Sequence, residues 1–240
     1  MPTHTKTLKM ISFWSRLLNL ISPQACPVCG NRMTVGETLV CGKCNLQLPR
    51  TGYSHDAYRN EMAKLFYLQI PVERAAAWFF YEAHSPVSRL LYRLKYQNHP
   101  ETGEEMGRMM AQEMRADDFF SGIDAIIPVP LTKKRQRERG YNQSMEIALG
   151  VSMATGIPIM KHALVRKTFA ESQTRKDRRA RHDNVEDAFE LNAETPLQGK
   201  HLLIIDDVVT TGATIIACGK LLMKAGVEKI SVLTIGFAKG

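Results

Sequence analysis

The chain has 240 residues, of which 44% are hydrophobic, and its formal net charge is +8 at pH 7. This length suits one substantial α/β domain plus a small module, since single domains usually run to about 100 to 200 residues. No apolar run approaches the roughly 20 residues that span a bilayer, so an integral membrane protein is not expected. The basic excess favours polyanionic ligands, with a merely solubilising surface as the alternative.

The first predicted element is a short amphipathic helix between Leu8 and Ile21, whose apolar residues repeat at helical spacing before Pro23. Arg16 interrupts the apolar run, and no small-residue cleavage site follows it. These features disfavour a signal peptide, and packing against the rest of the chain is expected instead.

Four cysteines follow as two Cys-x-x-Cys pairs that eleven residues separate, namely Cys26, Cys29, Cys41 and Cys44. This spacing is typical of a structural zinc ribbon, in which four thiolates close a tetrahedral coordination sphere. An iron centre on the same ligands, a disulfide pair and a redox couple are the alternatives. The sequence therefore predicts an N-terminal module over residues 1–50 that a metal helps to fold.

A linker with a short helix is expected over residues 51–70, before a larger domain over residues 71–240. That domain should begin with a strand from Ala75 to Tyr81 and continue with two helices, Ser88 to Tyr96 and Gly103 to Arg115. Lys95 lies at the end of the first helix, where it could reach a phosphate. A solvated helix face is the ordinary alternative.

A strand from Ile123 to Val129 leads into a basic stretch with five cations in seven residues, Lys133 to Arg139, followed by Tyr141 and Asn142. We expect a loop here that binds a diphosphate, because guanidinium groups pair bidentately with phosphate oxygens. A nucleic-acid-binding or simply solvated loop is the alternative. An amphipathic helix through Ile147 and Val151 should follow.

A short strand is expected at Ala163 to Lys167, and residues 168–184 after it are dense in charge without apolar periodicity. Long stretches of this kind inside a domain are often lids. A cationic lid could stabilise the charge of a departing diphosphate.

The most informative stretch begins with a buried parallel strand, Leu202 to Ile205, and continues with two acids and a hydroxyl-rich turn. A glycine-containing turn at a helix start can hold one phosphate, and adjacent acids can accept hydrogen bonds from sugar hydroxyls. The inferred ligand is a sugar phosphate, against the alternative of solvated or capping acids. A helix up to Gly226 and a last strand, Lys229 to Phe237, complete the sheet.

The run Ile-Ile-Asp-Asp-Val-Val-Thr-Thr-Gly-Ala-Thr is similar to the phosphoribosyl pyrophosphate (PRPP) signature of type I phosphoribosyltransferases. Together with the cysteine pairs and the Pro-Val-Pro turn that leads to Arg-Gly-Tyr-Asn-Gln, it resembles the ComF family over nearly the whole chain. The resemblance implies a type I phosphoribosyltransferase-like α/β fold, with a mainly parallel twisted sheet flanked by helices and an N-terminal zinc ribbon. It also implies a cytoplasmic protein associated with natural competence and DNA uptake.

The same resemblance assigns residues to parts of PRPP. The ribose 5-phosphate part would contact Asp206, Asp207, Thr210, Thr211, Gly212 and Thr214. The diphosphate would contact the stretch that contains Lys133, Arg139, Tyr141 and Asn142, and the lid would supply Gln173 and Arg181. Asp206, Asp207 and Arg181 are the catalytic candidates. The lid departs from the family pattern at Arg175-Lys176, where the family has an apolar residue.

Two functions remain open at this point. The first is a PRPP-dependent glycosyltransferase that uses Mg²⁺, moves a phosphoribosyl group to an unidentified acceptor base and releases pyrophosphate. The second is a non-catalytic PRPP sensor or a protein that handles single-stranded DNA with DNA-uptake proteins as partners. Single-strand binders usually offer aromatic stacking surfaces. Tyr141 is the only aromatic residue inside the first basic stretch, and Phe169 is the only one near the second. This scarcity of aromatic residues favours the first function modestly.

Overall fold

The computed structural model describes residues 25–167 and 188–239 and divides the chain into two units, residues 1–47 and 48–240. The helix predicted between Leu8 and Ile21 lies outside the described residues, and so does the predicted lid with Gln173 and Arg181. None of the described helices combines the length and the apolar character that crossing a membrane would require.

The described part of the first unit is a short cysteine-rich turn structure. Ala25 and Arg32 form an antiparallel bridge, and the backbone N–H of Cys26 donates to the Asn31 carbonyl at 2.8 Å. The helix α2, Gly42–Gln47, follows and carries Cys44. The second unit begins after it, at Leu48.

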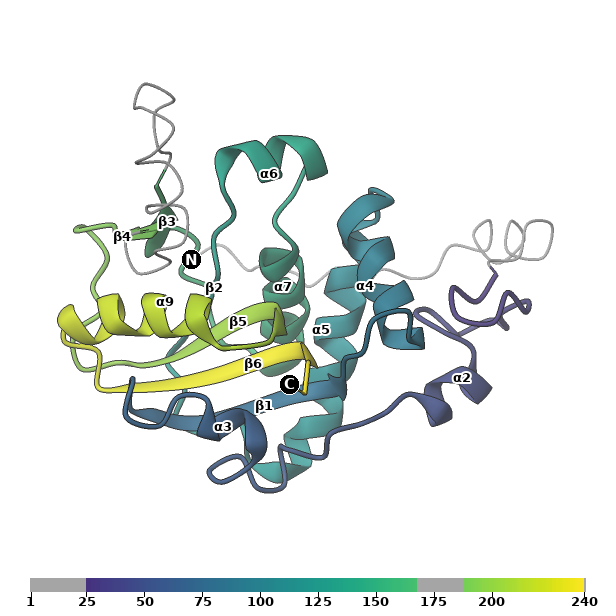
Figure 1. Ribbon diagram of the computed structural model, residues 1–240, viewed down its shortest axis with the longest axis horizontal. Coiled ribbons are helices and arrows are strands. Elements are labelled where there is room, and N and C mark those ends of the chain that lie inside the picture. The colour runs from purple at the N-terminus through teal and green to yellow at the C-terminus, as the bar shows by residue number, and fades with distance from the viewer. Residues whose placement is uncertain (1–24, 168–187, 240) are drawn as a thin grey trace, which may run out of the picture. The chain divides into compact units, whose positions relative to one another are not determined.

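A parallel four-stranded sheet forms the centre of the second unit, in the order β1-β6-β5-β2 (Figure 1). Its strands are β1 Val72–Phe80, β2 Ala125–Pro128, β5 His201–Val209 and β6 Lys229–Phe237. The aliphatic run of β5 is fully buried, because both faces of the sheet are covered. The predicted α/β fold with a mainly parallel sheet is therefore confirmed.

Helices cover both faces of this sheet (Figure 1). One face packs against α3, Glu61–Lys64, the turn after it, and α9, Ala213–Lys224. Phe66 in that turn and Ile215 and Leu222 on α9 are buried in one cluster with strand residues such as Ile204. On the other face, α7, Gln143–Thr155, packs against β5, β2 and α5, Pro100–Met114. The helix α4, Pro86–Tyr96, packs against α5, which ends in the short helix η1, Arg115–Asp117.

Glycines let α5 and α7 approach closely. A Cβ atom on Gly107 would lie 2.1 Å from the Ile147 carbonyl oxygen, and one on Gly150 would lie 1.9 Å from the Glu104 carbonyl oxygen. Only hydrogen fits at these two positions. This close crossing positions α7, which carries a residue of the candidate site, against α5.

The basic stretch is helical, which corrects the expected loop. The helix α6, Lys133–Arg139, begins at Thr132, whose side chain accepts a hydrogen bond from the Arg135 N–H, and it ends at Gly140 with φ of 79°. A capping hydroxyl and a left-handed glycine are the usual signals that bound a helix, and here they outweigh the repulsion of five cations.

A separate antiparallel pair consists of β3, Leu164–Arg166, and β4, Phe189–Leu191. These two strands flank the segment that the structure does not describe. The guanidinium of Arg166 lies 5.0 Å from the centre of the Phe189 ring.

Candidate functional site

The two acids of the PRPP-like stretch lie inside β5 and not after its end. The sequence predicts a strand that stops at Ile205, but β5 continues to Val209 because its pairing with β6 persists, with Asp206 opposite Thr234 and Val208 opposite Gly236. Asp206 and Asp207 are therefore held by the ladder near the carboxyl end of a central strand.

Each acid has a partner from a different helix. The Ser144 hydroxyl, in the first turn of α7, donates to Asp206 Oδ1 at 2.9 Å. The Lys95 ammonium, near the end of α4, lies 2.8 Å from Asp207 Oδ2, and both side chains of this ion pair are mostly buried. The Asp207 N–H also donates to Asp206 Oδ1, at 2.9 Å. The structure thus joins α4, α7 and β5 at the acids.

The environment raises the pKa of Asp206 to about 7, from an ordinary value of 3.8. Burial is the main cause, because it removes the carboxylate from water, and the negative charge of Asp207 acts in the same direction. The hydrogen bonds from Asp207 N–H and Ser144, and the charge of Lys95, lower this pKa but do not outweigh burial. Asp206 is therefore a carboxyl group that can change protonation near neutral pH.

The hydroxyl-rich turn lies between β5 and α9, directly after the acids. Gly212 has φ of 77° and begins α9, and a Cβ atom there would lie 3.1 Å from the Phe66 ring. Thr210 and Thr211 are exposed. The first N–H groups of a helix lack acceptors within the helix, so the turn and the Thr214 N–H can serve an anion. The predicted phosphate-binding residues are thus contiguous with the acids.

The residues predicted to bind diphosphate have defined contacts of their own. Arg139 donates to Gln143 Oε1 at 2.7 Å, and the Tyr141 hydroxyl donates to the Leu94 carbonyl. Asn142 accepts from the Ser144 N–H at 3.1 Å, which caps α7, and its amide donates to the Val129 carbonyl at 3.0 Å. Tyr141 and Asn142 therefore order the segment that connects α6 to α7.

Lys133 lies exposed in the first turn of α6, and no contact described for residues 25–167 and 188–239 joins it to the acids. Sequence reasoning missed Ser144 altogether. The one signal for it was its place two residues after Asn142, in the turn that starts a helix facing the sheet. Lys95 was suspected only as a phosphate contact, and its pairing with Asp207 was not expected.

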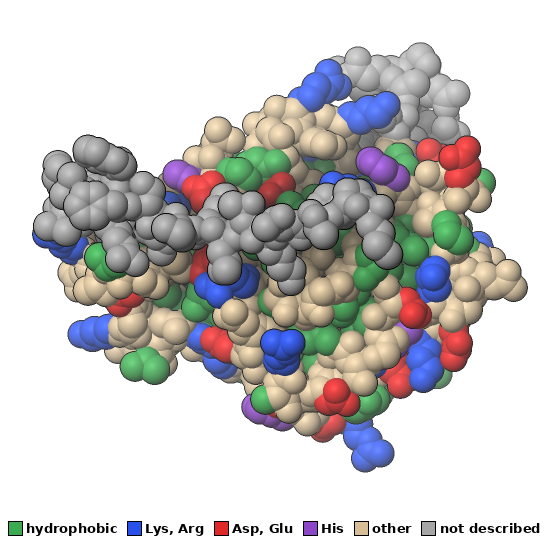
Figure 2. Space-filling model, turned by 180° about the vertical axis from the view of Figure 1, so that it is seen from behind, with side chains coloured by type: hydrophobic (Ala, Val, Ile, Leu, Met, Phe, Trp, Pro, Cys, Tyr) green, Lys and Arg blue, Asp and Glu red, His purple; other side chains and the backbone are tan. Residues whose placement is uncertain are grey.

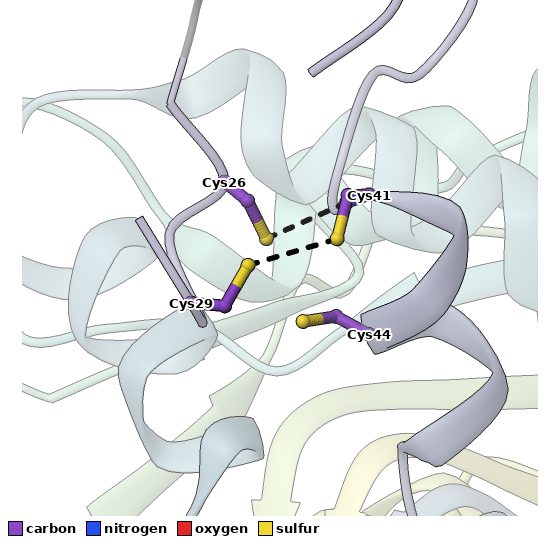
Figure 3. Close-up of side chains that lie close together, drawn as sticks. All are labelled: Cys26, Cys29, Cys41 and Cys44. Atoms are coloured by element: carbon purple, nitrogen blue, oxygen red, sulfur yellow. Dashed lines mark hydrogen bonds between the residues drawn. The ribbon is translucent and has the colours of Figure 1, made fainter. Parts of the chain in front are cut away.

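The four cysteines of the first unit point toward one another (Figure 3). Their four sulfur atoms all lie within 4.8 Å of one another, and the Sγ atoms of Cys29 and Cys41 are 3.7 Å apart. A regular tetrahedron with bonds of about 2.3 Å from zinc to sulfur has edges of about 3.8 Å. The cluster could therefore hold a zinc ion.

The electrostatics of the cluster agree with a cation site. Burial opposes ionisation of Cys26, but N–H groups of Cys41, Cys29 and Val28 outweigh it and lower the Cys26 pKa to about 7. For Cys44, burial and the neighbouring thiols raise the pKa to about 12. A bound cation would favour the thiolate form of these ligands, because coordination stabilises the negative charge on sulfur. Glu37 braces the second pair by accepting from the Gly42 N–H at 2.6 Å.

Comparison with known proteins supports the fold and extends to most of the chain. The family model described as "Phosphoribosyl transferase domain" matches residues 94–238. The DNA utilization protein YhgH of Escherichia coli O157:H7 is 30% identical over 210 residues, which cover 86% of this chain and 81% of that protein.

Two relatives have names that refer to competence. Competence protein F of Haemophilus influenzae is 32% identical over 151 residues, 61% of this chain and 66% of that protein. Competence protein ComFC of Bacillus subtilis is 30% identical over 101 residues, 42% of this chain and 39% of that protein.

Proposed function

The chain belongs to the ComF family of proteins with a phosphoribosyltransferase domain, and from this premise we propose that it binds PRPP at the carboxyl end of β5. The observation that carries the proposal is the pair of acids, each held by its own partner beside an exposed threonine turn. By analogy with the named relatives, we propose that PRPP binding serves DNA utilization during competence.

In this proposal the ligand is divided among three elements. Asp206 and Asp207 accept hydrogen bonds from the ribose hydroxyls, and the turn from Thr210 to Thr214 receives the 5-phosphate on its N–H groups. The α6 segment supplies cations to the diphosphate. Mg²⁺ suits the oxygen donors of the acids, but Ser144 and Lys95 already occupy one oxygen of each, so the ion would arrive with the diphosphate.

If the protein turns PRPP over, a nitrogen of the acceptor forms a bond to C1 of the ribose while the bond from C1 to oxygen breaks. Pyrophosphate leaves with the electron pair of that bond. The protein positions the two reactants and stabilises the charge of the leaving group, and none of its side chains forms a covalent intermediate. The Asp206 carboxylate, whose pKa is about 7, accepts the proton that the acceptor nitrogen loses in this proposal.

The test is calorimetric binding of PRPP with Mg²⁺ to the wild type and to the double variant Asp206→Asn with Asp207→Asn. We expect the variant to lose binding and keep its fold, whereas Asp56→Asn, which removes an exposed carboxylate elsewhere, should bind normally. Unaltered PRPP affinity in the double variant would disprove the assignment. Pyrophosphate release with candidate bases, followed in parallel, separates an enzyme from a sensor.

A second function, binding of single-stranded DNA, is favoured by a surface that the sequence did not reveal. Tyr92 and Tyr96 on α4 are 56% and 62% exposed, and their ring centres are 4.9 Å apart. The Arg139 guanidinium lies 5.4 Å from the centre of the Tyr96 ring. The helix α6 carries five cations, and Lys and Arg side chains lie at the upper edge of the view where this helix is placed (Figure 2). The aromatics that seemed scarce along the sequence are therefore supplied by another helix.

This second function predicts that Tyr92→Ala with Tyr96→Ala weakens binding of single-stranded DNA, while Tyr58→Ala, which removes a tyrosine that is 58% exposed elsewhere, does not. Binding should fall steeply with salt because α6 contributes through phosphate contacts. Equal DNA affinity in all three proteins would remove these tyrosines from the interface. A double Asp variant that still binds DNA would show that DNA binding does not need the two acids.

A further inference from the structure

The last turn of α4 touches two parts of the proposed PRPP site through three consecutive residues. Leu94 accepts a hydrogen bond through its carbonyl, Lys95 forms an ion pair, and Tyr96 packs its ring against a guanidinium. Their partners are Tyr141 after α6, Asp207 on β5 and Arg139 at the end of α6. This turn therefore joins the segment proposed for the diphosphate to the acids proposed for the ribose.

Lys95 compensates the charge of the acid pair. Adjacent carboxylates repel each other, and burial strengthens that repulsion because it reduces screening by water. Among the ion pairs of the described residues, the pair of Lys95 and Asp207 is the one that involves either acid. The lysine thus occupies the Asp207 Oδ2 atom, which a metal or a sugar hydroxyl would need.

We propose that Lys95 is the resident counterion of Asp207 and that it gives way to an incoming divalent cation, after which its ammonium contacts the diphosphate. The second step rests on the proposed function. A lysine suits such an exchange because its ammonium is a mobile point charge on a flexible stem. Its neighbours Leu94 and Tyr96 already contact the diphosphate segment, so the new partner of the ammonium would lie beside the same turn of α4.

The exchange predicts effects of opposite sign on two ligands. Lys95→Met removes the ammonium that competes for Asp207. Mn²⁺ without PRPP should therefore bind to this variant at least about threefold more tightly than to the wild type. PRPP with Mg²⁺ should bind about tenfold more weakly, because a charged hydrogen bond to the diphosphate is lost. A purely structural role for Lys95 would weaken both ligands together.

The experiment measures Mn²⁺ binding by electron paramagnetic resonance without PRPP, and PRPP binding by calorimetry. Lys95→Arg keeps the charge and should resemble the wild type for Mn²⁺. Lys229→Met is the matched control, because Lys229 pairs with Glu73 at 3.5 Å at the opposite, amino end of the sheet. It should change neither ligand, and thermal melting verifies that each variant is folded.

The Mn²⁺ measurement decides the exchange. Unchanged or weaker Mn²⁺ binding by folded Lys95→Met would overturn the proposal, whatever happens to PRPP. If Mn²⁺ binds more tightly but PRPP affinity stays at the wild-type value, the transfer of the ammonium to the diphosphate is refuted. A wild type that does not bind PRPP at all contradicts the proposed function, and it does so independently of the Mn²⁺ result.

Discussion

Asp206 illustrates, at the scale of a single residue, how a ligand site opposes folding. Its raised pKa means that the folded protein holds a proton on this carboxyl more tightly than the unfolded chain does. Ionisation therefore reduces stability progressively as the pH rises from the ordinary value of 3.8 to about 7, and the full penalty applies above that pH. A ligand that offers hydroxyl groups or a cation would relieve this penalty.

Replacement of Asp206 by Asn should accordingly stabilise the protein while it impairs the site. We expect the free energy of unfolding of Asp206→Asn to exceed that of the wild type by roughly 1 to 3 kcal/mol at pH 8. The gain should shrink at pH 5, where the folded wild type is protonated at this position. Urea unfolding at both pH values measures it, with Asp56→Asn as the exposed control, and a variant less stable than the wild type at pH 8 would contradict the expectation.

At this same scale, the sequence predicted the position of both acids and the threonine turn but not their partners. Residue type and spacing identify a carboxylate pair after an aliphatic strand, because that pattern is local. Ser144 lies 62 residues before Asp206 in the sequence, and Lys95 lies farther still from Asp207. Only the packing of α4 and α7 therefore reveals these partners. Ligand roles for the predicted site residues stay predictions.

At the scale of elements, the contact between α5 and α7 places Ser144. The sequence predicted both helices from their apolar periodicity, but periodicity does not say which glycines tolerate a side chain. The expected diphosphate loop is helical for a related reason. Thr132 and Gly140 supply caps that a count of charges overlooks.

The helix contact leads to a prediction about two glycines. Gly150→Ala should destabilise the protein by about 3 kcal/mol, because the new methyl group meets the Glu104 backbone, and this exceeds the gain of about 1 kcal/mol in helix propensity. Gly219→Ala on α9 is the matched control, since its methyl meets the terminal carbon of Ile70, which can rotate away. If urea unfolding shows the same loss of unfolding free energy in Gly150→Ala and Gly219→Ala, the close crossing is not what limits stability.

At the scale of the whole molecule, the chain contains one unit with a cysteine cluster that could hold a metal and a second unit with the proposed PRPP site. The division into residues 1–50, 51–70 and 71–240 stays a prediction, as does zinc in the cysteine cluster, although the four thiols do lie together. All described residues of the proposed PRPP site belong to the unit from Leu48 to Gly240. Zinc binding by the cysteines and PRPP binding should therefore be independent of each other.

This separation is tested by Cys26→Ser, which should lower the zinc content per chain and leave PRPP affinity unchanged. Elemental analysis and calorimetry on the same preparation give both values. Cys218→Ala is the control for loss of a cysteine, because Cys218 is buried in α9, where burial raises the pKa of its thiol and keeps it unreactive. Full zinc content in Cys26→Ser would remove that residue from the site.

The strand order has a consequence for how the chain folds during its synthesis on the ribosome. β6 follows every other described strand in sequence, yet it lies between β1 and β5. While the ribosome is still making residues 229–237, β1 and β5 have no partner on their facing edges, and both are rich in aliphatic or aromatic side chains. The sheet must therefore close after synthesis of β6, and until then the facing edges of β1 and β5 stay open to pairing with other chains.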